Sequence, residues 1–265
     1  MKLGLGLSLP SMQRRRDTIA FDPDFDPDAA SYIAAVETAD GQALEEGVRE
    51  AINDFVVGCK ADAIWDALEA SCILAGARTL NGALVPLVGA APTNFNFVPD
   101  DYNRVTGLKG NGSTKYLDGN RANNANPQNE NHNAIWASQT STVNGRWMGS
   151  WPGTGANLIS GLAGQAAFRS RTSDAAVNIA TAPNQRFIGM SRSNADNVNT
   201  RRNGVTTTDA QASQTTNANN VLIFGADGVY TDARLSFYSI GEAIDLAALD
   251  ARVSALMTAL DGAIA

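Results

Sequence analysis

The sequence predicts a mainly β protein, an antiparallel sandwich with a small helical module before it and a helix after it. Beyond residue 81, many short apolar runs alternate with Gly, Asn and Pro, whereas helical periodicity is confined to the two ends. Only 18% of the 265 residues are charged and 44% are hydrophobic. This balance excludes global disorder and is typical of a β-rich chain with many turns and its own hydrophobic core.

Residues 1–27 are expected to form a docking arm that attaches the chain to a neighbour. The segment opens with MKLGLGLSLP, and three arginines follow. A signal peptide has the opposite order, with basic residues before a continuous apolar stretch. An arm folded back on its own domain is the alternative. The side chains expected to make assembly contacts are Leu3, Leu5, Leu7, Arg14, Arg15 and Arg16.

Residues 28–78 are expected to form the helical module. The repeat FDPDFDPD ends in an aspartate and a proline that are typical of a helix N-cap and first turn, and a calcium site is the alternative interpretation. Apolar spacing predicts helices over 28–36, 42–57 and 61–69. Cys59 and Cys72 are expected to be buried free thiols, with a disulfide as the alternative.

Residues 79–241 are expected to form the sandwich. The pairs Asn144-Gly145 and Asn203-Gly204 predict tight hairpin turns, because both positions of such turns need a positive φ. The nine expected strands are residues 135–138, 147–150, 158–161, 166–169, 186–191, 198–202, 205–208, 221–225 and 234–240.

Residues 242–265 are expected to form the C-terminal helix. Its apolar residues recur at spacings of three and four over two heptads. Packing on the chain's own sheet or helices is one interpretation, and a seam between subunits is the other. The residues of this stripe are Leu246, Leu249, Val253, Leu256 and Leu260.

The formal net charge of −7 is distributed unevenly. Residues 1–16 carry four basic residues, residues 17–70 carry 14 acidic against two basic ones, and residues 71–265 are nearly balanced. Opposite charges on adjacent segments favour docking of the arm on the helical module. The acidic balance argues against nucleic-acid binding, and no apolar run approaches the roughly 18 residues of a membrane-spanning helix.

Several segments resemble, in their order, structural proteins of tailed bacteriophages. DFVVGCKADAIWDALEASCILAG at residues 54–76 resembles a segment that precedes their β domain. GLKGNGSTKY at residues 107–116 is similar to the glycine-rich opening of that domain, which is a concanavalin A-like, laminin-G-like jelly roll. Residues 132–141, RFIGMSR at 186–192, and RLSFYSIGEAI with its following helix resemble the later segments, so the resemblance spans roughly residues 28–262.

The resemblance implies a virion protein, assembled in the host cytoplasm, whose jelly roll binds glycans or neighbouring subunits. A position in the tail or tail fibre is the main interpretation, and a capsid-surface decoration or head-fibre protein is the alternative. A free bacterial lectin-like adhesin is the non-viral alternative. The expected partners are other virion proteins, a host-surface glycan and further copies of the chain as a homotrimer, since phage projections are commonly trimers.

The sequence predicts no catalytic centre and no cofactor. A nucleophilic site needs a base, and a zinc site needs several Cys or His ligands. His132 is the only histidine, and its Asn-rich surroundings predict a surface position. A calcium ion held by Asp118 or Asp227 is an alternative in the β domain, because laminin-G-like domains sometimes bind calcium.

Sugar binding is the favoured chemistry for the β domain. Sugars stack on aromatic faces and form hydrogen bonds with amides and hydroxyls. Trp136, Trp147 and Trp151 lie close together in the sequence, and the last two bracket Met-Gly-Ser. These three residues are the candidate glycan-binding side chains, and core or interface anchors are the alternative.

Overall fold

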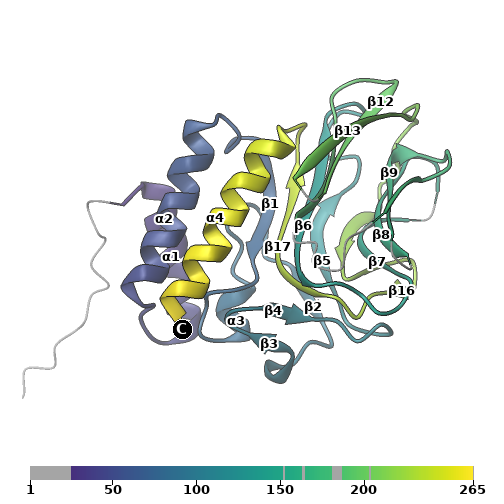
Figure 1. Cartoon of the computed structure of the whole chain (residues 1–265). Helices are drawn as coiled ribbons and strands as arrows, with labels where there is room; N and C mark the ends of the chain where they lie inside the picture. The colour runs from purple at the N-terminus through teal and green to yellow at the C-terminus, as the bar shows by residue number, and fades with distance from the viewer. Residues whose placement is uncertain (1–24, 152, 163–164, 181–186, 203, 265) are drawn as a thin grey trace, which may run out of the picture.

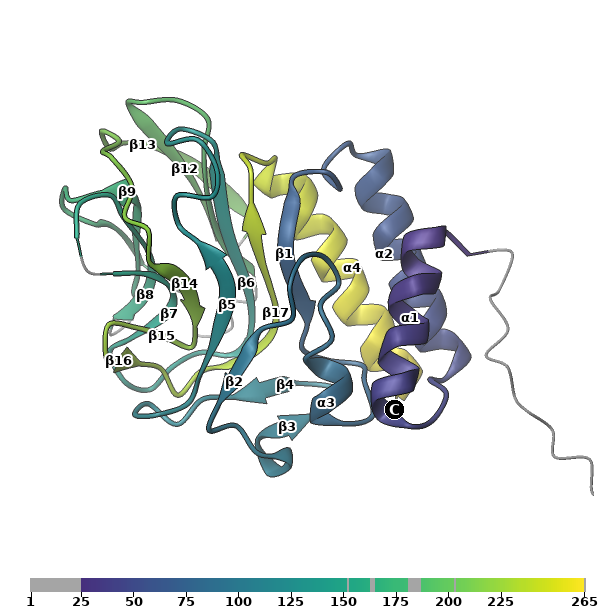
Figure 2. The same ribbon diagram turned by 180° about the vertical axis from the view of Figure 1, so that it is seen from behind.

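The chain folds into three layers, namely a helical layer, an eight-stranded sheet and a seven-stranded sheet (Figures 1 and 2). This computed structural model describes residues 25–151, 153–162, 165–180, 187–202 and 204–264. Neighbouring strands within each sheet run antiparallel. The predicted antiparallel sandwich with helices at both ends is therefore confirmed.

Two helices open the described part of the chain, α1 (Pro27–Asp40) and α2 (Glu46–Ala61). The side chain of Asp26 accepts a hydrogen bond from the backbone N–H of Asp28 at 3.0 Å. The aspartate–proline pair thus forms the predicted N-cap and first turn. Gly41 ends α1 in the left-handed conformation, with φ 70°.

The prediction of a third helix over residues 61–69 is wrong. The chain instead leaves α2 and enters β1 (Leu68–Ile73), which pairs antiparallel with β17 (Arg234–Gly241). Cys72 faces the core between the two sheets, whereas Ile73 faces the helical layer. A strand that is buried on both sides is apolar on both sides and loses the alternation that identifies strands. The expected helical module therefore contributes a strand to the sandwich.

The eight-stranded sheet is the middle layer. Its strand order is β13-β12-β11-β6-β17-β4-β3, and β1 pairs with β17 beside β4. The other strands are β3 (Tyr102–Asn103), β4 (Gly107–Lys109), β6 (Asn131–Gln139), β11 (Phe187–Arg192), β12 (Asn197–Arg202) and β13 (Val205–Ala210).

The seven-stranded sheet is the outer layer, in the order β10-β9-β8-β7-β14-β5-β2. A short ribbon of β15 (Gly225–Ala226) and β16 (Val229–Tyr230) lies beside β7. The helix α3 (Leu80–Ala83) and the 3-10 turn η1 (Pro99–Asp101) connect the layers. The strands of the outer sheet are β2 (Thr93–Phe95), β5 (Tyr116–Ala122), β7 (Gly145–Ser150), β8 (Ala156–Leu162), β9 (Gln165–Thr172), β10 (Val177–Ala180) and β14 (Asn220–Ile223).

All nine expected strands overlap with observed strands, but only one of the two expected hairpins forms. Arg202 on β12 pairs with Val205 on β13, so a two-residue turn joins these strands as predicted, although Asn203 itself lies outside the described residues. The hairpin predicted at Asn144-Gly145 is wrong. There the chain crosses from β6 in the middle sheet to β7 in the outer sheet.

Two hydrophobic cores hold the layers together. One lies between the two sheets, and the other lies between the middle sheet and the helices. In the second core the rings of Phe55 and Phe237 meet edge to face, with 5.8 Å between their centroids. Cys59 and Cys72 are buried free thiols in different cores, as predicted, and burial raises the pKa of each to about 12.

The C-terminal helix α4 (Leu246–Ile264) completes the helical layer by packing against α2 and β11 (Figure 1). Its apolar stripe is at most 3% exposed within the single chain. The seam between subunits is therefore wrong as an interpretation of this stripe, because the chain's own core already covers these side chains. The residues concerned are Leu246, Leu249, Val253, Leu256 and Leu260.

Acidic residues of the helical layer pair with arginines from later segments. Arg104 donates to Glu45 at 2.6 Å, and Arg252 of α4 donates to Asp62 at 2.7 Å. The hydrogen bond from Arg104 is the main cause that lowers the pKa of Glu45 to about 2. Opposite charges from distant segments thus meet within the chain, whereas docking of the basic arm stays a prediction because the arm lies outside the described residues.

Candidate ligand-binding site

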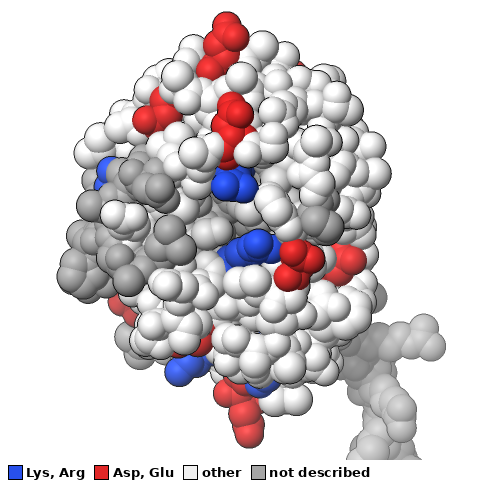
Figure 3. Space-filling model, turned by 90° about the vertical axis from the view of Figure 1, so that its right-hand side faces the viewer, with Lys and Arg blue, Asp and Glu red and all other residues white. Residues whose placement is uncertain are grey.

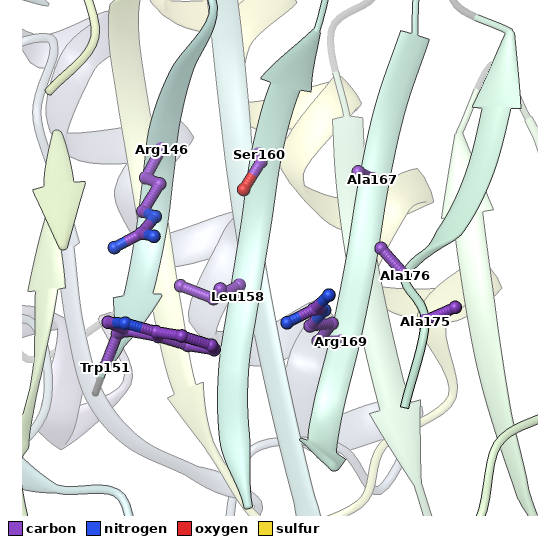
Figure 4. Close-up of a pocket in the computed structure, with 8 residues that line it drawn as sticks. All are labelled: Arg146, Trp151, Leu158, Ser160, Ala167, Arg169, Ala175 and Ala176. Carbon is purple, nitrogen blue, oxygen red and sulfur yellow. The ribbon is translucent and has the colours of Figure 1, made fainter. Parts of the chain in front are cut away.

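A pocket of about 470 Å³ opens on the outer face of the seven-stranded sheet, over β7, β8 and β9. Figure 3 views the molecule from this side and shows basic side chains in a hollow, with acidic side chains next to them and mainly uncharged residues around. Figure 4 shows the side chains that form the pocket. They are Arg146, Trp151, Leu158, Ser160, Ala167, Arg169, Ala175 and Ala176.

Strand alternation places small and polar side chains in this pocket. On β8, Leu158 and Ser160 line the pocket, and the residue between them is buried between the sheets. On β9, Ala167 and Arg169 line it on either side of the buried Phe168. Alanine and serine at these positions leave room for a ligand beside the longer side chains.

The contribution of β7 depends on an irregularity in its pairing with β8, between Arg146 and Met148. Trp147 and Met148 are consecutive, yet both are buried in the core between the sheets. A bulge adds one residue and reverses the side to which later residues point. Arg146 before the bulge and Trp151 just beyond the strand therefore line the same pocket.

Trp151 forms one wall of the pocket beside two guanidinium groups. The Cζ atoms of Arg146 and Arg169 lie 5.2 and 5.6 Å from the centroid of the indole ring. Figure 4 shows the ring edge-on, with both guanidinium groups and Leu158 on the same side of it. Such cation–π contacts are worth about 0.5–1 kcal/mol at exposed sites. One aromatic face, two planar donor groups and the Ser160 hydroxyl thus border a common space.

The two arginines of the pocket differ in their partners. Nη1 of Arg146 donates to the backbone oxygen of Ala226 at 2.8 Å and lies 3.6 Å from Oδ2 of Asp227. The Asp227 side chain is 45% exposed, so water screens this ion pair. Within the part of the chain that the structure describes, Arg169 contacts the Trp151 ring but forms no hydrogen bond or ion pair.

The three candidate tryptophans lie in three different places. Trp136 is buried between the middle sheet and the helices, and Trp147 is buried between the two sheets. The prediction is therefore wrong for these two residues. Trp136 lies on the middle sheet, whose two faces are covered, and strand alternation turns Trp147 of the outer sheet into the core. Of the three, only Trp151 lines the pocket, and it has an intermediate exposure.

The expected assembly contacts in the arm lie outside the described residues, so their role stays a prediction. They are Leu3, Leu5, Leu7, Arg14, Arg15 and Arg16. The homotrimer also stays a prediction, and it no longer has the support of the C-terminal stripe.

His132 is fully buried in β6, which corrects its expected surface position. Its Nδ1 lies 2.5 Å from the backbone oxygen of Glu242, and its Nε2 lies 2.6 Å from the Ser239 hydroxyl. Because a carbonyl oxygen only accepts, Nδ1 carries the proton and Nε2 accepts from Ser239. Burial lowers the pKa of His132 to about 4, so the ring is neutral at pH 7. Its role is to connect β6 with the end of β17.

The candidate calcium ligands already have polar partners. Asp118 accepts hydrogen bonds from Nδ2 of Asn220 at 3.0 and 3.2 Å, and Asp227 faces Arg146. Among the described residues, no group of three or more His, Cys, Asp and Glu is placed to hold a metal ion. No helix in the described ranges is long and apolar enough to cross a membrane.

No local motif in the sequence marks Arg146, Ser160 and Arg169 as site residues. The sequence feature that could have indicated them is strand alternation. Ser160 and Arg169 alternate with core residues along the two strands that follow Trp151 in the chain. Parity alone does not show which strands are neighbours or where β7 carries its bulge.

Solved structures of toxin binding domains share this fold. The botulinum neurotoxin serotype D binding domain has a TM-score of 0.50 and 9% identity, and the match covers 72% of this chain and 50% of that one. The receptor binding domain of the C/D mosaic serotype has a TM-score of 0.51 and 12% identity, with 72% and 51% covered. The serotype G binding domain has the same TM-score and identity, and its match covers the same percentages of the two chains.

The chain thus spans about half the length of these neighbours. At such identities the likeness shows a shared β-sandwich fold and nothing of the ligand. No family model matches the sequence, and no curated protein sequence matches it.

Proposed function

We propose that this chain is a non-catalytic, adhesin-like module that binds carbohydrate in the pocket beside Trp151. The observation that carries this proposal is the indole ring that forms a wall of a 470 Å³ pocket, with two guanidinium groups and a hydroxyl around it. Pyranose rings bind by stacking on an aromatic face while polar side chains fix their hydroxyls. The sandwich fold, which receptor-binding domains of known structure also have, is compatible with such a role.

The chemistry of the pocket favours binding over catalysis. Glycoside hydrolysis generally uses two carboxyl groups on opposite sides of the scissile bond. None of the eight lining residues is acidic, and the nearby Asp227 pairs with Arg146. The neutral, buried His132 is not available as a base at this surface.

Removing the indole ring is the direct test. We expect Trp151→Ala to weaken binding to the glycans that the protein recognises on a glycan array by at least about tenfold, because the stacking surface is lost. The free energy of unfolding should fall by no more than about 2 kcal/mol, the worth of two exposed cation–π contacts, since Trp151 contributes to neither core. Titration with the strongest array ligand and urea unfolding measure the two quantities.

Trp65→Ala is the matched control. Trp65 is half-buried beside α2 and also carries a single cation, Lys60, at 5.6 Å from its ring. This variant should bind glycans like the wild type. Wild-type binding by Trp151→Ala would contradict the proposal, and a loss of several kcal/mol in its stability would assign the ring a structural role instead.

The proposal extends to a virion of a tailed phage, with assembly in the host cytoplasm through the arm of residues 1–27. The ordered resemblance over roughly residues 28–262 supports it. The position that we favour is the tail or a tail fibre, and the alternative within the virion is a capsid-surface decoration or head-fibre protein. The non-viral alternative is a free bacterial lectin-like adhesin. Mass spectrometry and antibody labelling of purified particles test this, and a chain absent from every particle fraction would contradict a virion role.

A further inference from the structure

The pocket contains two arginine side chains, and one of them, Arg146, has a carboxylate nearby, that of Asp227. Arg146 and Arg169 both approach the Trp151 ring, and the eight lining residues include no carboxylate. Asp227 reaches Arg146 from outside the lining, at 3.6 Å and with a largely hydrated side chain. The pocket therefore keeps a positive charge in a part of the chain whose acidic and basic residues are otherwise nearly balanced.

A backbone carbonyl holds the guanidinium of Arg146, whereas the guanidinium of Arg169 is available to bind a ligand. The carbonyl of Ala226 holds the Arg146 guanidinium, and Asp227 sits next to it in the β15–β16 turn, with φ 49°. A ligand anion approaching Arg146 would meet the negative charge of Asp227. Arg169 lies across the pocket on β9 and has no hydrogen-bonding partner in the described ranges.

We propose that this pocket selects acidic sugars. Arg169 binds the carboxylate of the sugar, and the sugar's pyranose ring packs against Trp151. This inference rests on the proposed carbohydrate-binding function and specifies the ligand class. A guanidinium presents two parallel N–H donors that match the two oxygens of a carboxylate, and charge-assisted pairs of this kind are about twice as strong as neutral ones. Ser160 and the Arg146 donors remain for the hydroxyl groups of the same sugar.

The geometry of the floor fits this assignment. In Figure 4, Leu158 and Ser160 lie between the two arginines, and Ala167 lies beyond Arg169. Leu158 and Ser160, which are shorter than the arginines, form a strip between the two guanidinium groups. A sugar placed on this strip has the indole face at one side and can direct a carboxylate toward β9, away from Asp227.

An array of paired glycans tests the inference. Each acidic sugar on it, a uronate or a sialylated glycan, has a neutral partner that lacks only the carboxylate charge, as an alcohol or a methyl ester. We expect the wild type to prefer the acidic member of its best pair by about tenfold or more. Arg169→Gln should lose this preference yet keep its melting temperature, because Arg169 forms no hydrogen bond in the described structure.

Lys109→Gln is the matched control, since it removes one positive charge from an exposed position on β4 of the other sheet. This variant should retain the acidic preference. Equal binding of both members of each pair would overturn the acidic selectivity and leave carbohydrate binding intact. Retention of the preference by Arg169→Gln would also overturn the inference. Failure to bind any glycan would overturn the proposed function itself.

Discussion

Replacing Arg192 with methionine is expected to lower the free energy of unfolding by about 3–5 kcal/mol. Arg192 on β11 is fully buried, and burial lowers the pKa of its guanidinium, which nevertheless stays protonated. Methionine retains much of the volume but none of the donors. The carbonyls of the buried residues Ser170 and Gln211 would then lose their partner, and the loop that follows β11 would lose its anchor. The guanidinium donates to the backbone oxygens of Ser170, Asn194, Ala195, Asn197 and Gln211.

Arg169→Met is the matched control for this prediction. It is the same substitution on the neighbouring region of the sandwich, at a guanidinium without hydrogen bonds in the described part of the chain. Its effect on urea unfolding should stay within about 1 kcal/mol, the worth of its one cation–π contact. Arg192→Lys should fall between the two, because an ammonium keeps the charge but cannot reach all of these oxygens. A stability of Arg192→Met within about 1 kcal/mol of the wild type would contradict the anchoring role.

Stability is also expected to fall as the pH decreases from about 6.5 toward 4, by up to about 3 kcal/mol from His132 alone. The folded protein protonates this ring only near pH 4, whereas an unfolded chain protonates it near 6.5. Between these values the unfolded state binds more protons, so acid favours unfolding. The contribution is complete above pH 6.5 and is lost as the pH falls through the folded pKa.

His132→Gln separates this effect from the titration of carboxyl groups. Glutamine can donate and accept hydrogen bonds but does not titrate. Between pH 7 and pH 5, the wild type should lose about 2 kcal/mol more unfolding free energy than this variant. Urea unfolding at several pH values measures the slopes, and the comparison holds even if the variant is less stable at every pH. Parallel slopes would contradict the assignment.

Elements whose local residue pattern matches their environment could be predicted from the residues alone. Residues 237–240 alternate because one face of β17 meets each core, whereas a register shift before Phe237 puts Leu235 into the core between the sheets. The aspartate–proline pair before α1 satisfies helix N–H groups locally. The nine expected strands and both terminal helical regions were predictable on the same grounds. The strand β1 could not be predicted, because burial on both faces removes the alternation. Its residues Cys72 and Ile73 are consecutive and both apolar, since each packs into a different core.

Tertiary structure alone decided which of these side chains share a site. Trp136, Trp147 and Trp151 are close in sequence, yet they lie beneath the helices, between the sheets and on the outer face. Strand parity and a single bulge set these directions, and strand pairing then brought Arg169 beside Trp151 across β8. Sequence order constrains contacts along the chain, whereas the pocket arises from hydrogen-bonded neighbours in the sheet, which no local pattern specifies.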